Sequence, residues 1–453
     1  MERNKEEVTK KFSDLFSGII PERFPVWDAF GFEYILDYSG YDMLTVQYRY
    51  TQEIFEDMLE KSMEVSRGDT FDVSFARNAV ALMLQKSKYL VMSNTGFIQH
   101  PESVFMQADE YDEFIKNPID YTISHIVPRQ APAYDDDPAL RSLNFAKYVL
   151  ASMDQRKMLG AASAKVFGKY GVYSPPPGTA GMQTIPFDRI ADNFRGFSQI
   201  HSDLRRIPQK VEDACEALMP YAIWGSSRIK PSTLGYASVK THMGAYLSNK
   251  DFERFYWPTF HKLSHINAER GVDMDLFLEH DWSRFIDCLQ DLPQGARMYM
   301  EYGDPQTFKD KLGSKFVLGG FYPMMLLKAG TKQQVIDKAK EIIDIMAPGG
   351  NFYFRFDKSV YTVKDMNIEN YFALMDYIQE HSKYDNAGQP SMTGDKAASI
   401  QRGYADNYPA FKSKYFVSFE EFTADYPYVY PQAEELMRAQ YEKYTSMTEG
   451  FLM

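Results

Sequence analysis

The chain has 453 residues, of which 44% are hydrophobic and 25% are charged, a balance that is ordinary for a globular protein. Its formal net charge of −12 argues against nucleic acid or an anionic membrane as the main partner, because phosphate groups need a cationic surface. The charged start, MERNKEEVTKKF, and the lack of any stretch near the roughly 20 apolar residues of a membrane span predict a cytoplasmic protein with no membrane partner.

Short apolar runs alternate with stretches of helical period, which predicts an α/β fold with parallel strands. Eight such runs, with helices between them, indicate a (β/α)8 TIM barrel that follows an N-terminal helical segment. In a barrel of this kind the chemistry lies at the carboxyl ends of the strands. We predict strands over Phe24–Asp28, Tyr89–Met92, Gly168–Ser174, Tyr236–Val239, Met274–His280, Met298–Tyr302, Phe316–Gly320 and Phe352–Asp357.

One helix is predicted with its cap. The segment Gln333–Met346 repeats apolar residues at helical spacing, and Thr331 can cap its amino end. The apolar positions of this helix are Val335, Ala339, Ile342, Ile343 and Met346.

The segment 384–453 differs from the rest, because it is rich in Tyr, Gly and Pro and ends in a predicted helix over Ala433–Thr445. We interpret it as a C-terminal extension that packs on the barrel or on a partner subunit, as in a homodimer. A partly mobile tail is the alternative. The two cysteines, Cys215 and Cys288, form no CxxC pair, so neither a disulfide framework nor a thiolate metal cluster is indicated.

Three predicted strands end in side chains that could bind a metal. Glu279 and His280 end the fifth strand, Glu301 ends the sixth, and Asp357 ends the eighth. Carboxylate and imidazole ligands suit Zn²⁺, and a bound metal with an open position would act as a Lewis acid. Such carboxylates can instead bond backbone N–H groups or pair with arginines such as Arg284 and Arg355. Within a strand, adjacent Glu279 and His280 would also point to opposite sides.

His242 follows the fourth predicted strand and could position a substrate or act as an acid, although a lone histidine can also be a structural hydrogen-bonder. His261 and His265 stand one helical turn apart and could bind a metal or lie on a solvated helix face. The sequence has no GxGxxG after a strand, no GxxxxGK[ST] and no GxSxG, which disfavours dinucleotide, P-loop and hydrolase functions.

Several short sequence motifs, taken in their order along the chain, resemble the uroporphyrinogen decarboxylase superfamily. They cover roughly residues 20 to 383, which lie within the predicted catalytic domain, 1–383. The resemblance is carried by the order and spacing of several segments together. They are Arg23-Phe24-Pro25-Val26-Trp27, Pro186-Phe187-Asp188, Phe194-Arg195-Gly196 with Asp203-Leu204 and Pro208, Asp251–Pro258 (DFERFYWP), Leu318-Gly319-Gly320 with Leu326, Gly330-Thr331 and Val335, and Gly349-Gly350 with Asn367–Asn370.

The methyltransferase branch of the superfamily fits better than the decarboxylases. Decarboxylases carry arginines just after the first strand to hold an acidic tetrapyrrole. Here the matching stretch, residues 25–34, has neither arginine, and Asp28 and Glu33 add negative charge that would repel a polyanion. Glu279 stands where thiol-methylating relatives have a zinc-binding Cys, and the run Glu279-His280-Asp281-Trp282 followed by Leu292-Pro293 resembles the methyl-donor enzymes of O-demethylation.

The resemblance implies a methyltransferase that moves a methyl group from a methoxylated aromatic or other methylated small molecule to the cob(I)alamin of a separate corrinoid protein. It implies a zinc site built from Glu279, His280, Glu301 and Asp357, with His242, Glu279 and His280 as catalytic residues. A decarboxylase of a tetrapyrrole-like or small acid and a non-catalytic ligand-binding barrel remain the alternatives. The expected substrate-lining aromatics are Trp27, Phe30, Phe32, Tyr173, Phe321 and Tyr322.

Overall fold

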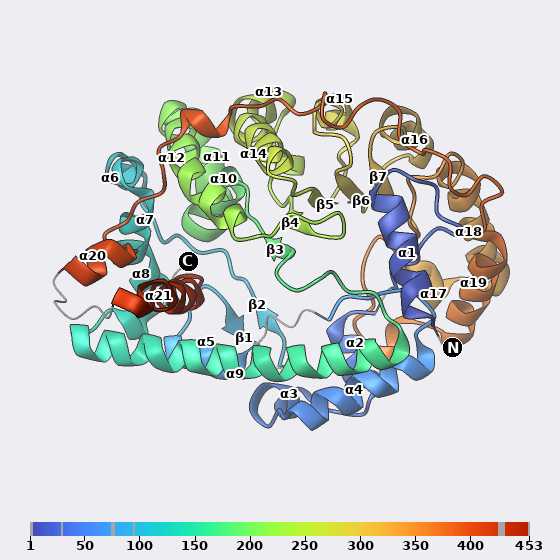
Figure 1. Ribbon diagram of the computed structural model, residues 1–453, viewed down its shortest axis with the longest axis horizontal. Coiled ribbons are helices and arrows are strands. Elements are labelled where there is room, and N and C mark those ends of the chain that lie inside the picture. The colour runs from blue at the N-terminus through green and yellow to red at the C-terminus, as the bar shows by residue number, and fades with distance from the viewer. Residues whose placement is uncertain (1–2, 29, 74–77, 94–95, 425–430, 452–453) are drawn as a thin grey trace. The chain divides into compact units, whose positions relative to one another are not determined.

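The structure is a computed structural model that describes residues 3–28, 30–73, 78–93, 96–424 and 431–451 (Figure 1). The chain forms two compact units. The first contains residues 1–77, 155–188 and 225–407, and the second contains residues 78–154, 189–224 and 408–453. Helices α9 (Pro138–Tyr170) and α12 (Pro208–Ser227) include residues of both units. In the described part of the chain, no helix combines the length and the apolar character that crossing a membrane requires.

The first unit contains a five-stranded parallel sheet in the order β3-β4-β5-β6-β7, so neighbouring strands follow one another in the chain (Figure 1). Helices occupy the crossovers, as parallel pairing requires. The strands are β3 (Ala180–Met182), β4 (Tyr236–Lys240), β5 (Met274–Leu278), β6 (Arg297–Met300) and β7 (Val317–Gly320). The helices of this unit are α1 (Lys5–Phe16), α2 (Phe32–Tyr38), α3 (Met43–Tyr48), α4 (Gln52–Val65), α10 (Pro186–Asp188), α13 (Asn249–Asp251), α14 (Trp257–Glu269), α15 (Ile286–Leu289), α16 (Pro305–Leu312), α17 (Met325–Ala329), α18 (Lys332–Met346) and α19 (Ile368–His381).

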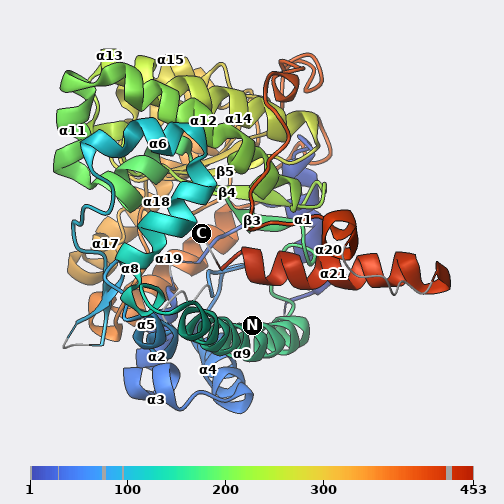
Figure 2. The same ribbon diagram turned by 90° about the vertical axis from the view of Figure 1, so that its left-hand side faces the viewer.

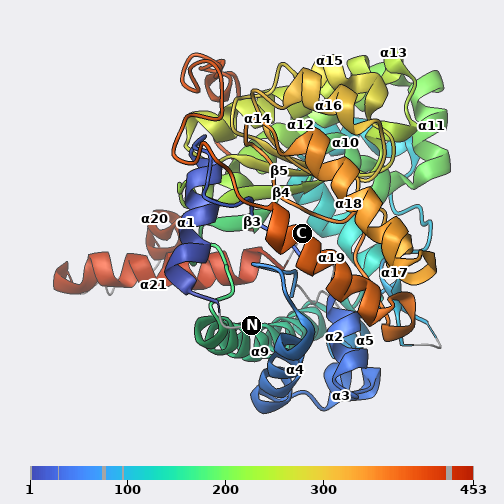
Figure 3. The same ribbon diagram turned by 90° about the vertical axis from the view of Figure 1, so that its right-hand side faces the viewer.

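Helix α18 confirms its prediction in detail. Thr331 accepts from the backbone N–H of Gln334, and the Gln334 side chain accepts from the N–H of Thr331, which makes a capping box. The five predicted apolar positions are all buried, and Figure 3 shows α18 beside α19, with α16 on its other side.

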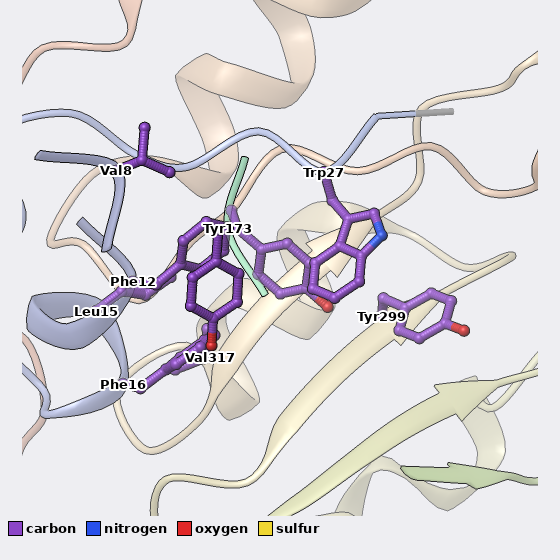
Figure 4. Packing of buried hydrophobic residues seen from close by; sticks show 9 residues of the cluster. Val8, Phe12, Leu15, Phe16, Trp27, Tyr173, Tyr299 and Val317 are labelled. Atoms are coloured by element: carbon purple, nitrogen blue, oxygen red, sulfur yellow. The ribbon is translucent and has the colours of Figure 1, made fainter. Parts of the chain in front are cut away.

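Helix α1 provides the predicted N-terminal helical segment. Asn4 caps it, and its apolar residues at positions 8, 12, 15 and 16 share one face. This face packs on residues of β6, β7 and the neighbouring loops, and the ring of Phe12 stacks on that of Tyr173 at 4.0 Å (Figure 4). The cluster therefore fills the interior of the unit below the carboxyl ends of the strands. It contains Val8, Phe12, Leu15, Phe16, Trp27, Tyr173, Tyr299, Val317 and Tyr353.

Four strand predictions, those for β4 to β7, are confirmed within two residues of their ends. The strand predicted over Gly168–Ser174 is wrong, because α9 continues to Tyr170 and ends at Gly171, whose φ of 65° suits glycine. The strand predicted over Tyr89–Met92 is reduced to β1 (Val91–Met92), which pairs antiparallel with β2 (Ile98–Gln99) in the second unit. The sequence prediction missed β3.

The described strands form no closed sheet, so the predicted barrel is not confirmed. The segments predicted as the first and eighth strands make isolated parallel bridges instead. Leu318 of β7 bridges Phe352, Phe354 bridges Val26, and Trp27 bridges Thr70. The backbone N–H of Tyr173 then donates to the carbonyl oxygen of Asp69.

The second unit is mainly helical. Its core holds a buried ion pair in which the Arg195 guanidinium donates to both oxygens of Asp203, at 2.6 and 2.9 Å, and the Tyr111 hydroxyl donates to the same carboxylate. Helices α20 and α21 lie side by side, with the ring of Tyr441 on Phe419 and Phe422 (Figure 2). The helices are α5 (Ala79–Gln85), α6 (Tyr111–Lys116), α7 (Pro118–Tyr121), α8 (Val127–Gln130), α11 (Phe197–Arg206), α20 (Phe419–Ala424) and α21 (Glu434–Glu449).

The predicted C-terminal extension contributes to both units. Its first part hydrogen-bonds within the first unit, where the N–H of Ser391 donates to Gly18 and Lys396 pairs with Asp273 at 2.7 Å. Residues 408–453 belong to the second unit, and α21 confirms the predicted terminal helix. Residues 425–430 of the extension lie outside the described residues. The division into a domain over 1–383 and an extension over 384–453 stays a prediction.

Candidate active site

A cavity of about 710 Å³ lies at the carboxyl ends of β4, β5 and β6, and its lining residues all belong to the first unit. Parallel strands end at the same edge of a sheet, so side chains far apart in the sequence meet there. The structure brings together every predicted acid, base and metal ligand in this lining. These residues are His242, Glu279, His280, Glu301 and Asp357.

Two layers of side chains line the cavity, because alternate residues of a strand face the same side. The first layer contains residues near the ends of the strands. The second layer contains the residues two positions further along the chain, at or just beyond the strand ends, and these are the predicted site residues. The second layer is His242, Glu279, Glu301 and Asp357, and the first layer is Lys240, Phe277, Tyr299 and Arg355.

Sequence reasoning missed the first layer, because it sought acids, bases and metal ligands only at the strand ends and placed the substrate-lining aromatics elsewhere. The signal was present, since the same period of two that places Glu279 in the cavity also places Phe277 there. The missed residues give the cavity its aromatic wall and two cations. The ring of Phe277 stacks on that of Tyr299 at 4.6 Å.

His280 reaches the cavity because β5 ends before it, at Leu278. Its backbone has a φ of 62°, a left-handed conformation that is uncommon for a residue with a side chain. This turn allows both Glu279 and His280 to line the cavity, which regular alternation would prevent. The His280 N–H donates to Glu301 at 2.8 Å, and the buried Trp282 indole N–H donates to the carbonyl oxygen of Glu279 at 2.9 Å, so the loop is held at two points.

His242 and Glu279 form an acid–base pair at the cavity. Nδ1 of His242 lies 3.4 Å from Oε2 of Glu279, and the two side chains are 51% and 30% exposed. A carboxylate beside one imidazole nitrogen orients the ring. This arrangement suits a histidine that gives a proton to a leaving group.

Glu301 is buried and charged. Its Oε1 lies 2.5 Å from the ammonium of Lys358, and its Oε2 accepts from the His280 N–H. Burial alone would raise the pKa of Glu301, but the Lys358 ammonium and the His280 N–H outweigh it and hold the pKa below the ordinary value. The same contact with Glu301 raises the pKa of Lys358.

Asp357 is positioned by backbone donors. Its Oδ1 accepts from the N–H of Met324 at 2.9 Å and from its neighbour Lys358 at 2.7 Å. Burial raises its pKa above the ordinary value despite these two donors. Asp357 therefore connects the loop after β7, which contains Met324, to the segment beginning at Phe352 that bridges β7.

The predicted zinc ligands were tested against this geometry. Both oxygens of Glu301 and one oxygen of Asp357 already accept from protein donors. Among the described residues, no three His, Cys, Asp or Glu side chains come together as a metal-binding group. The observed arrangement thus does not fit a three-ligand zinc site.

The six predicted substrate-lining aromatics are all buried, and none of them is among the residues that line this cavity. Trp27 and Tyr173 belong to the cluster around α1, and the hydroxyl of Tyr322 donates to the carbonyl oxygen of Val335. Phe30 stacks on Tyr34. These contacts favour packing roles for Trp27, Phe30, Phe32, Tyr173, Phe321 and Tyr322. The aromatic residues of the lining are Tyr236, Phe277, Tyr299, Phe356 and Tyr361.

The fold defines an α/β protein with a parallel sheet and its candidate site at the carboxyl edge. The sequence matches no family model and no curated protein. The structure is similar to solved structures, among them a methyltransferase from Methanosarcina mazei, with a TM-score of 0.54 and 12% sequence identity. The match covers 82% of this chain and 98% of the methyltransferase. At this identity the likeness shows a shared fold.

Proposed function

We propose that the chain is a methyltransferase that takes a methyl group from a methoxylated, aromatic small molecule and delivers it to the cob(I)alamin of a separate corrinoid protein. The observation that carries the proposal is the cavity of about 710 Å³, which combines an aromatic wall with the His242–Glu279 pair. The shared fold with a methyltransferase supports the same reaction class. The proposal also accounts for the motifs that resemble the methyltransferase branch of the uroporphyrinogen decarboxylase superfamily.

The proposal includes a closed (β/α)8 barrel. The support comes from the isolated parallel bridges, which continue the pairing order from β7 through residues 352–356 and 26–27 to residue 70. The hydrogen bond from Tyr173 to Asp69 leads on toward β3, which pairs with β4. In such a ring the cavity is the mouth at the carboxyl ends of the strands, where barrel enzymes hold their active sites.

The reaction breaks the bond between the methyl carbon and the ether oxygen. The reduced corrinoid is the co-substrate that supplies the nucleophile for the methyl carbon, and the electron pair of the broken bond stays on the oxygen. His242, positioned by Glu279, gives a proton to that oxygen and remains as a neutral imidazole, so a phenol is released. Proton donation of this kind contributes about 100-fold to 10,000-fold in rate.

The aromatic wall and the loop after β5 prepare the cavity for this chemistry. Phe277, whose other face stacks on Tyr299, offers a ring face on which an aromatic donor can stack. Trp282, which is fully buried, keeps Glu279 in place through its bond to the backbone. A fixed Glu279 in turn fixes the ring of His242, because pre-organised groups need no rearrangement during the reaction.

The experiment is a methyl-transfer assay with the purified full chain. A methoxyarene with an isotope-labelled methyl group is mixed with cob(I)alamin, either free or bound to a separately purified corrinoid protein. Label on the corrinoid and release of the phenol support the proposal. The absence of both, with every methoxyarene and both forms of acceptor, rejects it, and release of CO₂ from uroporphyrinogen or a small acid would favour decarboxylation instead.

A further inference from the structure

Two cations flank one aromatic side chain in the first layer of the cavity. The ammonium of Lys240 donates to the Tyr299 hydroxyl at 2.9 Å. The guanidinium carbon of Arg355 lies 3.7 Å from the centre of the same Tyr299 ring. Both cations line the cavity, and neither was identified from the sequence as a ligand-binding residue.

Lys240 is held in place but not neutralised. Its ammonium lies 5.7 and 5.3 Å from the ring centres of Phe277 and Tyr299, which stack on one another. Within the described residues, no carboxylate lies within ion-pair distance of it. An ammonium has three donors, and the Tyr299 hydroxyl occupies one of them.

Arg355 is more deeply buried, with only 9% of its side chain exposed. Its guanidinium lies against the ring of Trp27 at 4.4 Å and pairs through Nη2 with Asp72 at 3.1 Å, while Nη1 has no hydrogen-bond partner in the described part of the chain. Figure 4 shows Trp27 and Tyr299, the two rings that hold this guanidinium. A buried donor without a partner is uncommon and indicates a missing ligand or water.

The acidic residues of this layer do not cancel both cations. Asp72 is 45% exposed and is the carboxylate that pairs with Arg355. Asp28 also lines the cavity, but its Oδ2 accepts from Ser66, Gly68 and Tyr371 and so is held by these groups rather than by either cation. An uncompensated positive charge therefore remains at Lys240.

We propose that the cavity contains a subsite for a carboxylate, in which Lys240 is the principal cation and Arg355 is the second. The proposal rests on the proposed function and deepens it, since it states that the methyl donor is a methoxylated aromatic acid. The acid carries a single carboxylate, because the subsite offers one uncompensated charge and the Glu279, Glu301 and Asp357 carboxylates of the second layer would repel another.

The spacing between Lys240, the last residue of β4, and His242 supports one orientation of the methyl donor in the cavity. Lys240 and His242 are two residues apart, so an extended chain separates them by about 7 Å. That is about the span of a benzene ring with substituents at opposite ends. A carboxylate at Lys240 thus places an ether oxygen on the far side of the ring near His242, while the ring itself lies along Phe277.

The test is calorimetric binding of 4-methoxybenzoate to the purified full chain, beside 4-methoxybenzamide, which has the same shape without the charge. We expect wild-type protein to bind the benzoate at least tenfold more tightly than the benzamide. Lys240→Met should weaken benzoate binding by about tenfold to a hundredfold, as expected for loss of a charge-assisted hydrogen bond, and weaken benzamide binding less, because the amide oxygen carries no charge. The control, Lys340→Met, removes an equal charge from the exposed face of α18 and should change neither affinity.

Equal affinities of wild-type protein for the two compounds, or binding of neither, overturn the subsite, and this result does not depend on how well the variant folds. An unchanged benzoate affinity in folded Lys240→Met also overturns it. Methyl transfer from the benzamide as fast as from the benzoate would overturn the subsite and leave the proposed function intact. Lys240-dependent benzoate binding without any methyl transfer would support the subsite and reject the function.

Discussion

Replacing Lys358 with methionine removes the cation that keeps the buried Glu301 charged. The Glu301 side chain is 3% exposed and that of Lys358 is 49% exposed, with 2.5 Å between Oε1 and Nζ. Breaking a fully buried ion pair costs about 3–5 kcal/mol, and breaking an exposed pair costs at most about 1 kcal/mol. Since one partner is buried and the other is half exposed, we expect Lys358→Met to lower the free energy of unfolding by about 2 kcal/mol at pH 7.

The loss should depend on pH in a defined direction. In the wild-type protein the pKa of Glu301 lies below its ordinary value of 4.5, so its contribution to stability is present above pH 4.5 and is lost as the pH falls through the lowered pKa. In Lys358→Met the pKa of Glu301 should rise, because burial is then opposed only by His280, so the charged Glu301 is less well compensated at neutral pH. The two proteins should become similar in stability at acidic pH, where Glu301 is protonated in both.

Urea unfolding followed by tryptophan fluorescence at pH 7 and pH 4 measures this difference. The matched control is Lys328→Met, because Lys328 is 45% exposed and pairs with Asp365 at 2.9 Å, but Asp365 is 32% exposed. The control should cost at most about 1 kcal/mol. A loss in Lys358→Met no larger than in the control, or a loss of the same size at pH 4 as at pH 7, would refute the assignment of Glu301 as a buried charge held by Lys358.

Three further outcomes are expected. Burial and the neighbouring His261 lower the pKa of His265 to about 4, so between pH 6.5 and 4 the unfolded chain binds more protons than the folded protein. The free energy of unfolding should therefore fall by up to about 1.4 kcal/mol for each pH unit in this range. His265→Gln should flatten this slope when unfolding is measured at a series of acidic pH values. Thr331→Ala removes the cap of α18 and should cost about 1 kcal/mol in urea unfolding, while Thr362→Ala, outside any α-helix cap, serves as the comparison. Elemental analysis of the purified protein should find no stoichiometric zinc, and one zinc per chain retained after dialysis would show that the second-layer carboxylates rearrange to bind it.

The sequence predicted the carboxyl edge of the sheet well, because β4 to β7 are apolar runs that stop at polar or glycine residues. It did not predict β3, whose residues Ala180, Gly181 and Met182 have little strand preference. Tertiary packing determines this strand, since a Cβ at Gly181 would lie 3.0 Å from the side chain of Ile229. Tertiary packing also explains why the strand prediction for Gly168–Ser174 is wrong, because this strand-like run contains the end of the long helix α9.

The site could be predicted only in part, because local sequence shows where strands end but does not show which partners a side chain has. Strand ends can be found from local sequence, so Glu279, Glu301 and Asp357 were identified as neighbours in space. Whether a carboxylate is free to bind a metal depends on its partners, and the contact between Glu301 and Lys358 cannot be read from local sequence. The burial of the six predicted aromatics likewise depends on how α1 and the bridging segments pack.

The measurement that tests the central claim most directly is a single-turnover comparison of wild-type protein and His242→Gln. Label is followed from a series of methoxyarenes, 4-methoxybenzoate and 4-methoxybenzamide among them, to cob(I)alamin, with each protein in excess over the donor. Because His242 is 51% exposed, the variant should fold like the wild-type protein. We predict methyl transfer by the wild-type protein and a rate about 100-fold to 10,000-fold lower in His242→Gln. Equal rates in the two proteins, or no transfer by either, would contradict the account of this cavity as a methyltransferase site.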